Sequence, residues 1–462
     1  MAMSRTRRVL LSVLGLGSVV AVGIVTFAFL PTPTRPIAPV ASAPSHDLIE
    51  AGRYVATAGD CVACHTTQGG RPFAGGLPMA TPIGTIHTTN ITPDRETGIG
   101  GYSLEDFERV MRHGIRPNGE TIYPAMPYPS YARMTDDDIR ALYAYFQHAV
   151  EPVRQADAPN DIPWPLSMRW PLAIWRKVFV GSDAPVFDAS RYPDPQVARG
   201  AYLVQGPGHC GTCHTARAIT LQEVALDESS ADYLGGGQVI DGWFAVNLRG
   251  NTGDGLGRWT AEDIENTLRT GRNRDHAVIG TPMSDVVYHS TQDMTEDDLR
   301  AIAAYLKTLT PARGNRATYA EDRRTAEALI AGEDLGRGSQ IYQDSCTACH
   351  RNSGFGQPGA FPVIAGNPTV LADNPTSVIR LILNGSALPS THQAPSNLGM
   401  PNFDWRYSDA EIAELVTFIR RGFGNNASVV DARAVAEVRR VLDAERRHTS
   451  PGRRDDRITA AQ

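Results

Sequence analysis

The sequence predicts an all-α protein built from three small tandem domains with long loops, preceded by an apolar segment at the amino terminus. Two observations support this fold class. All six cysteines fall into three identical Cys-x-x-Cys-His motifs that are spread along the chain. Each motif follows a glycine-led helix and precedes a capped amphipathic helix, so one unit of structure recurs three times. A length of 462 residues also fits about three domains of ordinary size.

The amino-terminal segment has the pattern of an export signal or a membrane anchor. Arg5, Arg7 and Arg8 precede an apolar run at residues 9–30, and a positive end of this kind stays in the cytoplasm. The run is longer than the ~7 to 15 residues of a cleavable signal and close to the ~20 that span a bilayer. We therefore favour a retained anchor, with a tether that ends at residue 45. Cleavage near Ala41-Ser42-Ala43 is the alternative.

Each repeated unit is expected to begin and end with a helix. The first helices contain Gly52, Gly200 and Gly338, and so small a residue suits a close crossing of two helices. The last helices follow a Ser or Thr with an acidic residue three positions later, which is the pattern of a capping box, at Thr135, Thr295 and Ser408. Weaker helices are expected at 103–113, 260–270 and 375–384, between long Gly/Pro loops.

These patterns divide the chain into domains and connecting segments. The predicted domains are residues 46–150, 193–312 and 333–425, and the predicted linkers are 151–192 and 313–332. The first linker carries an apolar patch that suits a partner surface, a membrane surface or packing between domains, formed by Trp164, Trp170, Ile174 and Trp175. Residues 426–462 form a charged tail that is expected to lie as a helix on another surface.

The cysteine motifs predict covalently bound haem. They consist of Cys61, Cys64 and His65, of Cys210, Cys213 and His214, and of Cys346, Cys349 and His350. Two intervening residues let both thiols reach the two vinyl groups of one haem, and the histidine then binds the iron. A zinc site would normally join two Cys-x-x-Cys pairs, which leaves one of three unmatched, and a redox dithiol needs a βαβ context. The sequence therefore predicts three haem c groups.

The sixth iron ligand is expected to be a methionine that recurs before the last helix of each unit. Met400 is the one methionine after His350, and Met126 and Met283 occupy equivalent places, each next to a proline in a predicted loop. Met79 remains an alternative in the first domain. Met134 and Met294 each precede a capping Thr and are expected to pack inside the domains, and Met111 falls within a predicted helix. Thioether ligation raises the reduction potential and closes the iron site, which favours electron transfer.

Several function classes are disfavoured by the sequence. A net charge of −6 argues against a nucleic-acid partner. We find no Ser/His/Asp arrangement, phosphate-binding loop or dinucleotide fingerprint, so we expect no substrate-oxidising site in the chain itself. His209, which adjoins Cys210, could tune a haem, but a surface or loop role is the simpler expectation for it and for the histidines outside the motifs.

The residues around the motifs resemble a known family. The segments that carry the resemblance are Phe73-Ala74-Gly75-Gly76, Thr89-Asn90-Ile91-Thr92-Pro93-Asp94, Tyr123-Pro124-Ala125-Met126-Pro127-Tyr128, Gly206-Pro207-Gly208-His209 and Ala394-Pro395-Ser396-Asn397-Leu398-Gly399-Met400-Pro401. They are similar to those of the tri-haem cytochrome c subunit of bacterial membrane-bound alcohol, gluconate and polyol dehydrogenases, which has class I cytochrome c domains.

This resemblance implies a function. It implies a partner dehydrogenase that contains pyrroloquinoline quinone (PQQ) or FAD, electron relay through three haems, and reduction of ubiquinone at the periplasmic side of the cytoplasmic membrane. Similar cytochromes serve molybdenum-dependent dehydrogenases of aldehydes or N-heterocycles, and a carrier that delivers electrons to a terminal oxidase is a further alternative. The predicted anchor at 9–30 departs from the many relatives that have a cleaved signal.

Overall fold

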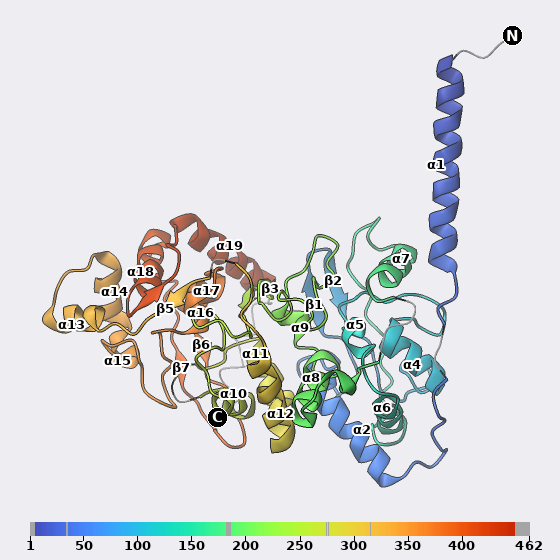
Figure 1. Ribbon diagram of the computed structural model, residues 1–462, viewed down its shortest axis with the longest axis horizontal. Coiled ribbons are helices and arrows are strands. Elements are labelled where there is room, and N and C mark those ends of the chain that lie inside the picture. The colour runs from blue at the N-terminus through green and yellow to red at the C-terminus, as the bar shows by residue number, and fades with distance from the viewer. Residues whose placement is uncertain are drawn as a thin grey trace. The chain divides into compact units, whose positions relative to one another are not determined.

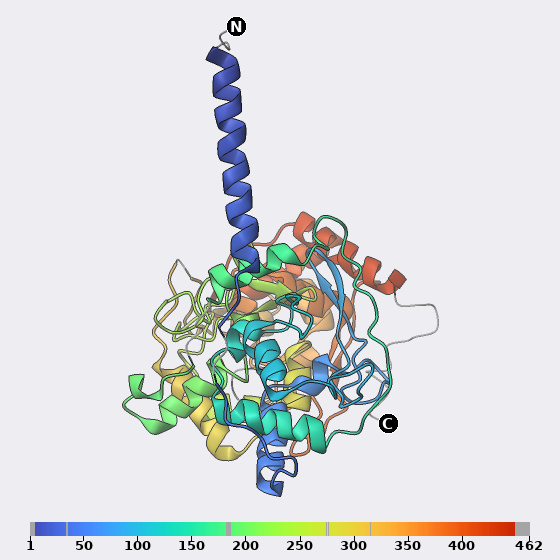
Figure 2. The ribbon, with the colours of Figure 1, turned by 90° about the vertical axis from the view of Figure 1, so that its right-hand side faces the viewer.

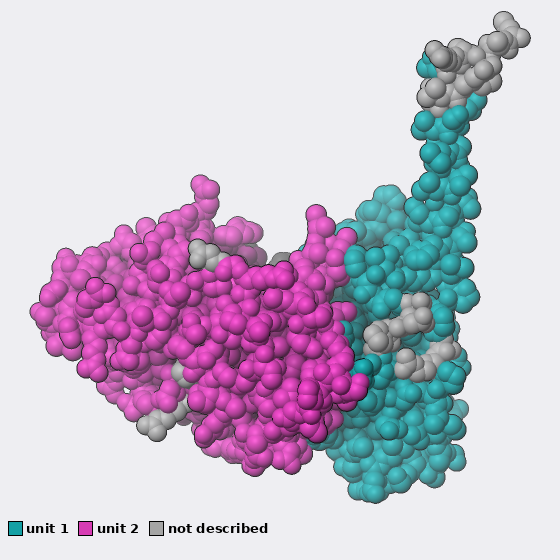
Figure 3. Space-filling model, viewed as in Figure 1, with its two compact units in different colours: residues 1–55, 64–188 teal, residues 56–63, 189–462 magenta. Residues whose placement is uncertain are grey.

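The computed structural model describes residues 5–33, 36–181, 186–273, 275, 277–314 and 316–448, so the end of the predicted tail, 449–462, lies outside the described residues. Within these ranges the chain is mostly helical, and the strands form two-stranded antiparallel sheets, β1-β2, β3-β4, β5-β8 and β6-β7 (Figure 1). The chain divides into two compact units, residues 1–55 with 64–188 and residues 56–63 with 189–462 (Figure 3).

The amino-terminal helix α1 (Arg5–Phe29) is long and apolar enough to cross a membrane. Its stretch from Leu11 to Phe29 has a mean hydropathy of 2.2, and only 6% of it is buried. A signal sequence near an amino terminus has the same properties, so the helix fits both forms of the prediction.

The first repeat contains helices and one small hairpin. Its elements are α2 (His46–Ala58), α3 (Cys61–Cys64), β1 (Pro78–Thr81), β2 (Gly84–His87), α4 (Leu104–His113), α5 (Tyr128–Tyr131) and α6 (Asp136–His148), followed by α7 (Trp170–Phe179). The segment after α6 packs back on this repeat, because Asn90 Nδ2 donates to Val153 O over 2.7 Å and Gln155 Nε2 donates to Ala74 O over 2.8 Å. Residues up to 188 therefore belong to the first unit.

The second repeat has the same order of elements. It consists of η1 (Ala189–Arg191), α8 (Pro195–Gln205), α9 (Gly211–His214), β3 (Gln238–Ile240), β4 (Trp243–Ala245), α10 (Ala261–Thr270), α11 (Met283–His289), η2 (Thr291–Asp293) and α12 (Glu296–Thr308). Its core gathers around Leu203, Leu299 and Tyr305, which are buried.

The third repeat includes a short strand and a short helix before its glycine-led helix. Its elements are β5 (Thr318–Tyr319), α13 (Arg324–Ala331), α14 (Arg337–Ser345), α15 (Thr347–His350), α16 (Pro368–Leu371), α17 (Thr376–Asn384), β6 (Ser386–Ala387), β7 (Gly399–Met400), α18 (Asp409–Arg421), β8 (Asn425–Asn426) and α19 (Ala432–His448). Its core is one hydrophobic cluster that includes Ile341, Ile382, Leu415 and Val435.

The first and last helices of each repeat cross at the predicted glycines. A Cβ on Gly52 would lie 1.9 Å from Ala141 O, one on Gly200 1.9 Å from Ala301 O, and one on Gly338 2.3 Å from Glu414 O. No side chain fits at such separations. Glycine is therefore required at these positions because two helix backbones meet there.

The predicted caps begin the last helices. Thr135, Thr295 and Ser408 each accept a hydrogen bond from the N–H of the residue three positions later, and Ser408 and Glu411 form the reciprocal capping box. Two of these acidic residues also bind the first helix of their repeat, because Arg199 donates to Asp298 over 2.8 Å and Arg337 Nη2 donates to Glu411 over 2.6 Å.

The charged tail helix packs on its own repeat. Val435, Val438 and Leu442 of α19 are buried in the core cluster of the third repeat, where α19 contacts α17 and α18. Arg439 Nε donates to Asp409 over 2.6 Å. The helical spacing of its valines and leucines predicted a helix that lies on another surface, and in the structure that surface is the third repeat itself.

Candidate haem-binding sites

The motif histidines have the same hydrogen-bond arrangement in all three repeats. Each Nδ1 lies within hydrogen-bond distance of a main-chain carbonyl, namely His65 and Thr89 O at 2.7 Å, His214 and Val246 O at 2.7 Å, and His350 and Pro362 O at 3.0 Å. Because a carbonyl oxygen only accepts, the proton must be on Nδ1. Nε2 then keeps its lone pair for a metal ion.

The surroundings of these rings favour the neutral form that binds a metal. Burial lowers the pKa of His65, His214 and His350, and the carbonyl partners oppose this only in part. Each residue nevertheless keeps part of its surface accessible. A neutral ring with one fixed nitrogen and an accessible edge fits the proximal ligand of a haem.

A glycine fixes the main chain of each motif histidine, and the motif pattern alone did not indicate this role. The N–H groups of Gly75, Gly236 and Gly356 donate to the carbonyls of His65, His214 and His350 over 2.7, 2.8 and 3.0 Å. All three glycines have a positive φ. A Cβ would collide with the segment that supplies the Nδ1 acceptor, for example 2.4 Å from Thr89 C at Gly75 and 2.3 Å from Phe361 O at Gly356.

These glycines were difficult to identify from the sequence, because they follow their histidines at unequal distances. The one feature that the three glycines share in the sequence is a second glycine within two positions, as in Ala74-Gly75-Gly76. Positive φ and close backbone approach together explain why no other residue type serves there.

Each motif forms a short helix, α3, α9 or α15, and Cys210 and Cys346 are the residues that directly precede α9 and α15. Burial raises the pKa of Cys210 and of Cys346 to about 12 and that of Cys213 to about 11. Thiols with such values are protonated at neutral pH and react poorly in disulfide exchange. Burial therefore disfavours a redox dithiol at these three cysteines of the second and third motifs.

The predicted methionine ligands come from three kinds of local structure. Met126 lies in a turn before α5, Met283 is the first residue of α11, and Met400 lies in β7, where it pairs with Ser386. All three are half-buried. The expectation that each lies in a loop is therefore correct only for Met126.

The rival methionines are placed differently. Met111, Met134 and Met294 are buried in the hydrophobic core, as packing residues are. Met79 lies in β1 opposite Ile86. Core packing accounts for the first three, and Met79 remains the alternative to Met126.

His209 is half-buried in the loop that leads into the second motif, as expected for a loop histidine. Its Nε2 lies 3.3 Å from the main-chain oxygen of Gly59, two residues before Cys61, and burial lowers its pKa. His209 thus contacts the segment that leads into the first motif.

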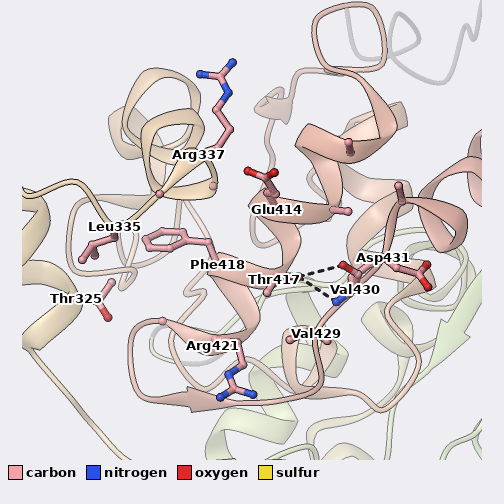
Figure 4. A pocket seen from close by; sticks show the side chains of 16 residues that line it. Thr325, Leu335, Arg337, Glu414, Thr417, Phe418, Arg421, Val429, Val430 and Asp431 are labelled. Atoms are coloured by element: carbon pink, nitrogen blue, oxygen red, sulfur yellow. Dashed lines mark hydrogen bonds between the residues drawn. The ribbon is translucent and has the colours of Figure 1, made fainter.

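A groove of about 730 Å³ lies on the outer side of the α14 and α18 crossing (Figure 4). Leu335, Phe418 and Val429 contribute apolar surface, and Thr417 Oγ1 is hydrogen-bonded to Val430 N and O. The lining includes neither the third motif nor Met400. It is therefore distinct from the candidate haem site.

Three stretches of the chain, residues 49–149, 197–310 and 335–422, match the cytochrome c family model. Each stretch contains one complete Cys-x-x-Cys-His motif with its fixed histidine. The chain therefore belongs to the cytochrome c family, and its three motifs imply three haem c groups.

Individual relatives show which type of cytochrome c the chain resembles. The chain is 52% identical over 397 residues to the gluconate 2-dehydrogenase cytochrome c subunit of Pantoea cypripedii, covering 85% of this chain and 90% of that protein. It is 50% identical over 381 residues to the cytochrome c subunit of alcohol dehydrogenase (quinone) of Gluconobacter oxydans, covering 82% and 79%. It is 38% identical over 383 residues to a nicotinate dehydrogenase subunit of Pseudomonas putida, covering 81% and 30%.

The predicted resemblance is confirmed by these relatives. The protein is an electron-transfer subunit of the type found in quinone-reducing membrane dehydrogenases.

Proposed function

We propose that this subunit accepts electrons from a catalytic dehydrogenase partner and relays them through three haem c groups to ubiquinone. The observation that carries the proposal is the threefold repetition of one proximal arrangement, in which a carbonyl fixes the histidine ring. Haem iron supplies one-electron chemistry, and the chain supplies its ligands, orientation and shielding from water.

The proposed ligand pairs are His65 with Met126, His214 with Met283 and His350 with Met400. The proposed thioether attachments are the two cysteines of each motif, Cys61 and Cys64, Cys210 and Cys213, and Cys346 and Cys349. The carbonyl-bound rings and the half-buried methionines support these assignments. The proposed cytochrome c domains are residues 46–150, 193–312 and 333–425, and α19 packs on the third of them.

Contacts inside the second unit support electron transfer between the second and third haems. A Cβ on Gly280, three residues before Met283, would lie 3.5 Å from Ser386 Oγ, and Ser386 pairs with Met400. Phe244, two residues before the carbonyl that holds His214, accepts and donates hydrogen bonds with Ser377 over 3.3 and 2.8 Å. The ligand-bearing segments of the two repeats therefore meet.

The proposed partner carries PQQ or FAD, and the proposed location is the periplasmic side of the cytoplasmic membrane with residues 9–30 as the anchor. The quinone named for the Gluconobacter relative supports ubiquinone as acceptor. The apolar exposed stretch from Leu11 to Phe29 supports the anchor.

A second candidate is the cytochrome part of a dehydrogenase that oxidises an aldehyde or N-heterocycle with molybdenum. The similarity to the nicotinate dehydrogenase of Pseudomonas putida favours it. The higher identity to the gluconate and alcohol relatives, over most of their length, favours the first candidate.

The test is purification of the native protein from membranes, followed by identification of what co-purifies. Ubiquinone reduction is then assayed with gluconate, alcohols, aldehydes and nicotinate. A partner with PQQ or FAD and reduction driven by gluconate or an alcohol is expected. A molybdenum partner would move the assignment to the second candidate. A tri-haem protein recovered alone, reducible but inert toward quinone, would indicate a carrier that serves a terminal oxidase.

A further inference from the structure

Helix α7 presents an apolar face to the outside of the first unit. Trp170, Ile174 and Val178 follow one another at helical spacing, and Trp170 and Val178 are 39% and 60% exposed. The turn just before α7 adds Trp164, which is 78% exposed, and Leu166, which is 50% exposed. An exposed apolar patch of this kind marks a contact with a membrane or with another protein.

The opposite face of α7 is packed firmly against the first repeat. The Trp175 ring lies edge-on to Tyr128 with 6.3 Å between centroids, and Arg176 is buried. The turn is also fixed, because Tyr123 OH donates to Leu166 O over 2.9 Å and Arg169 stacks 3.9 Å from the Tyr123 ring. The exposed face is therefore held in place.

Lys177 joins this helix to the end of α1. Its Nζ donates to Phe27 O and Leu30 O over 2.6 Å each and lies 3.3 Å from Ala28 O. The last carbonyls of a helix lack partners within it. A lysine at that end donates hydrogen bonds to them, and its positive charge interacts favourably with the negative end of the helix dipole. Helix α7 consequently lies at the foot of α1 in both views (Figures 1 and 2).

We propose that α7 and the turn at 164–166 form a second membrane contact, which lies in the lipid interface at the outer end of α1. Tryptophans favour this depth because their rings are apolar with one polar edge. Arg5, Arg7 and Arg8 place the opposite end of α1 in the cytoplasm, so α7 meets the periplasmic leaflet.

The inference rests on the proposed anchor, and the contact is continuous with that helix, α1, which is why a lipid bilayer is the occupant rather than a protein. Two attachment points hold the first unit in one orientation on the membrane, whereas α1 alone would leave it free to rotate. This inference does not depend on which dehydrogenase is the partner.

Site-directed spin labelling can test the contact in the full-length haem protein. All six native cysteines belong to haem motifs, so an introduced cysteine is the free thiol that takes the label. Trp164→Cys and Val178→Cys report on the proposed surface, and Ile219→Cys, at a residue 98% exposed in the second repeat, is the matched apolar control. Haem absorbance verifies that each variant has folded.

The labelled proteins are reconstituted into phosphatidylethanolamine/phosphatidylglycerol vesicles with the haems reduced. For spin labels at positions 164 and 178, we expect collisions with oxygen to become more frequent and collisions with a water-soluble nickel complex to become less frequent. Both changes are measured relative to the same label in detergent solution and to the label at position 219. Water-like accessibility at both positions would overturn the proposal. Shielding that appears only after a dehydrogenase partner is added would also overturn it, because the surface would then bind protein.

A second label tests the junction. With the label at Leu30→Cys, adding Lys177→Ala should increase label mobility, because the end of α1 loses its hydrogen-bond donor. Unchanged mobility would refute the role of Lys177 in fixing α7 to α1.

Discussion

The proximal and distal sides of the three candidate haem sites are built in different ways. On the proximal side, His65, His214 and His350 have the same carbonyl partner geometry and the same supporting glycine. Of the proposed distal ligands, Met126 lies in a turn, Met283 begins a helix and Met400 lies in a strand. One side is constant, and the other varies.

The difference follows from the chemistry of attachment. Two thioether bonds and an adjacent histidine fix the haem within five residues, so the ring must point in one direction and the local backbone has little freedom. A methionine approaches from the other face on a flexible side chain, and many backbone conformations can present its sulfur. Proximal substitutions should therefore damage folding, whereas distal ones should mainly change redox properties.

The largest effect is expected at a proximal glycine. Gly356→Ala should destabilise the third repeat by about 3 kcal/mol, because a positive φ and a Cβ 2.3 Å from Phe361 O act together. Gly359→Ala in the same loop has a positive φ and open space, so about 1 kcal/mol is expected. Denaturant unfolding and haem content measure both variants. An equal loss of unfolding free energy in the two variants would show that the close approach of Phe361 O to Gly356 does not contribute to the effect.

A distal substitution should keep the fold and change the potential. Met126→Leu preserves size and apolarity but removes the sulfur, so one haem should lose its sulfur-to-iron charge-transfer band and its potential should fall by roughly 0.1 V. Redox titration of the purified protein measures the shift. Met79→Leu is the matched control and should leave all three potentials unchanged. A fall in one potential in Met79→Leu, with unchanged potentials in Met126→Leu, would make Met79 the ligand.

The smallest effect concerns the ion pair that joins the two sides of the third site. Arg337 precedes the proximal motif, and Glu411 follows Met400, the proposed distal ligand. The hydrogen bond from Arg337, together with those from Ser408, lowers the pKa of Glu411 from 4.5 to about 2. Because the folded pKa is lowered, the stabilisation is complete above pH 4.5 and is lost as the pH falls toward 2. Arg337→Gln should therefore weaken the dependence of unfolding on pH between those values.

The check is denaturant unfolding of both proteins at about pH 7 and about pH 3, on either side of the ordinary glutamate pKa, followed by haem absorbance. The variant should lose less stability between the two conditions than the parent chain does. An identical loss in both proteins would show that the pair does not join the two sides.

The sequence predicted the parts of this protein that are encoded locally. Three complete motifs, three capping residues and three crossing glycines were sufficient to identify the repeats, the number of haems and the family, because each feature depends on neighbours a few positions away. The apolar stripe of α19 was visible for the same reason, although its partner was not.

Contacts between distant residues had to come from the tertiary structure. The carbonyl that fixes His65 belongs to Thr89, 24 residues further on, and those that fix His214 and His350 lie 32 and 12 residues away. No periodic pattern links positions at such unequal separations. The same holds for Lys177 and Phe27, which are 150 residues apart. A sequence specifies local geometry through nearest neighbours, whereas hydrogen-bond partners across loops are decided only when the helices pack.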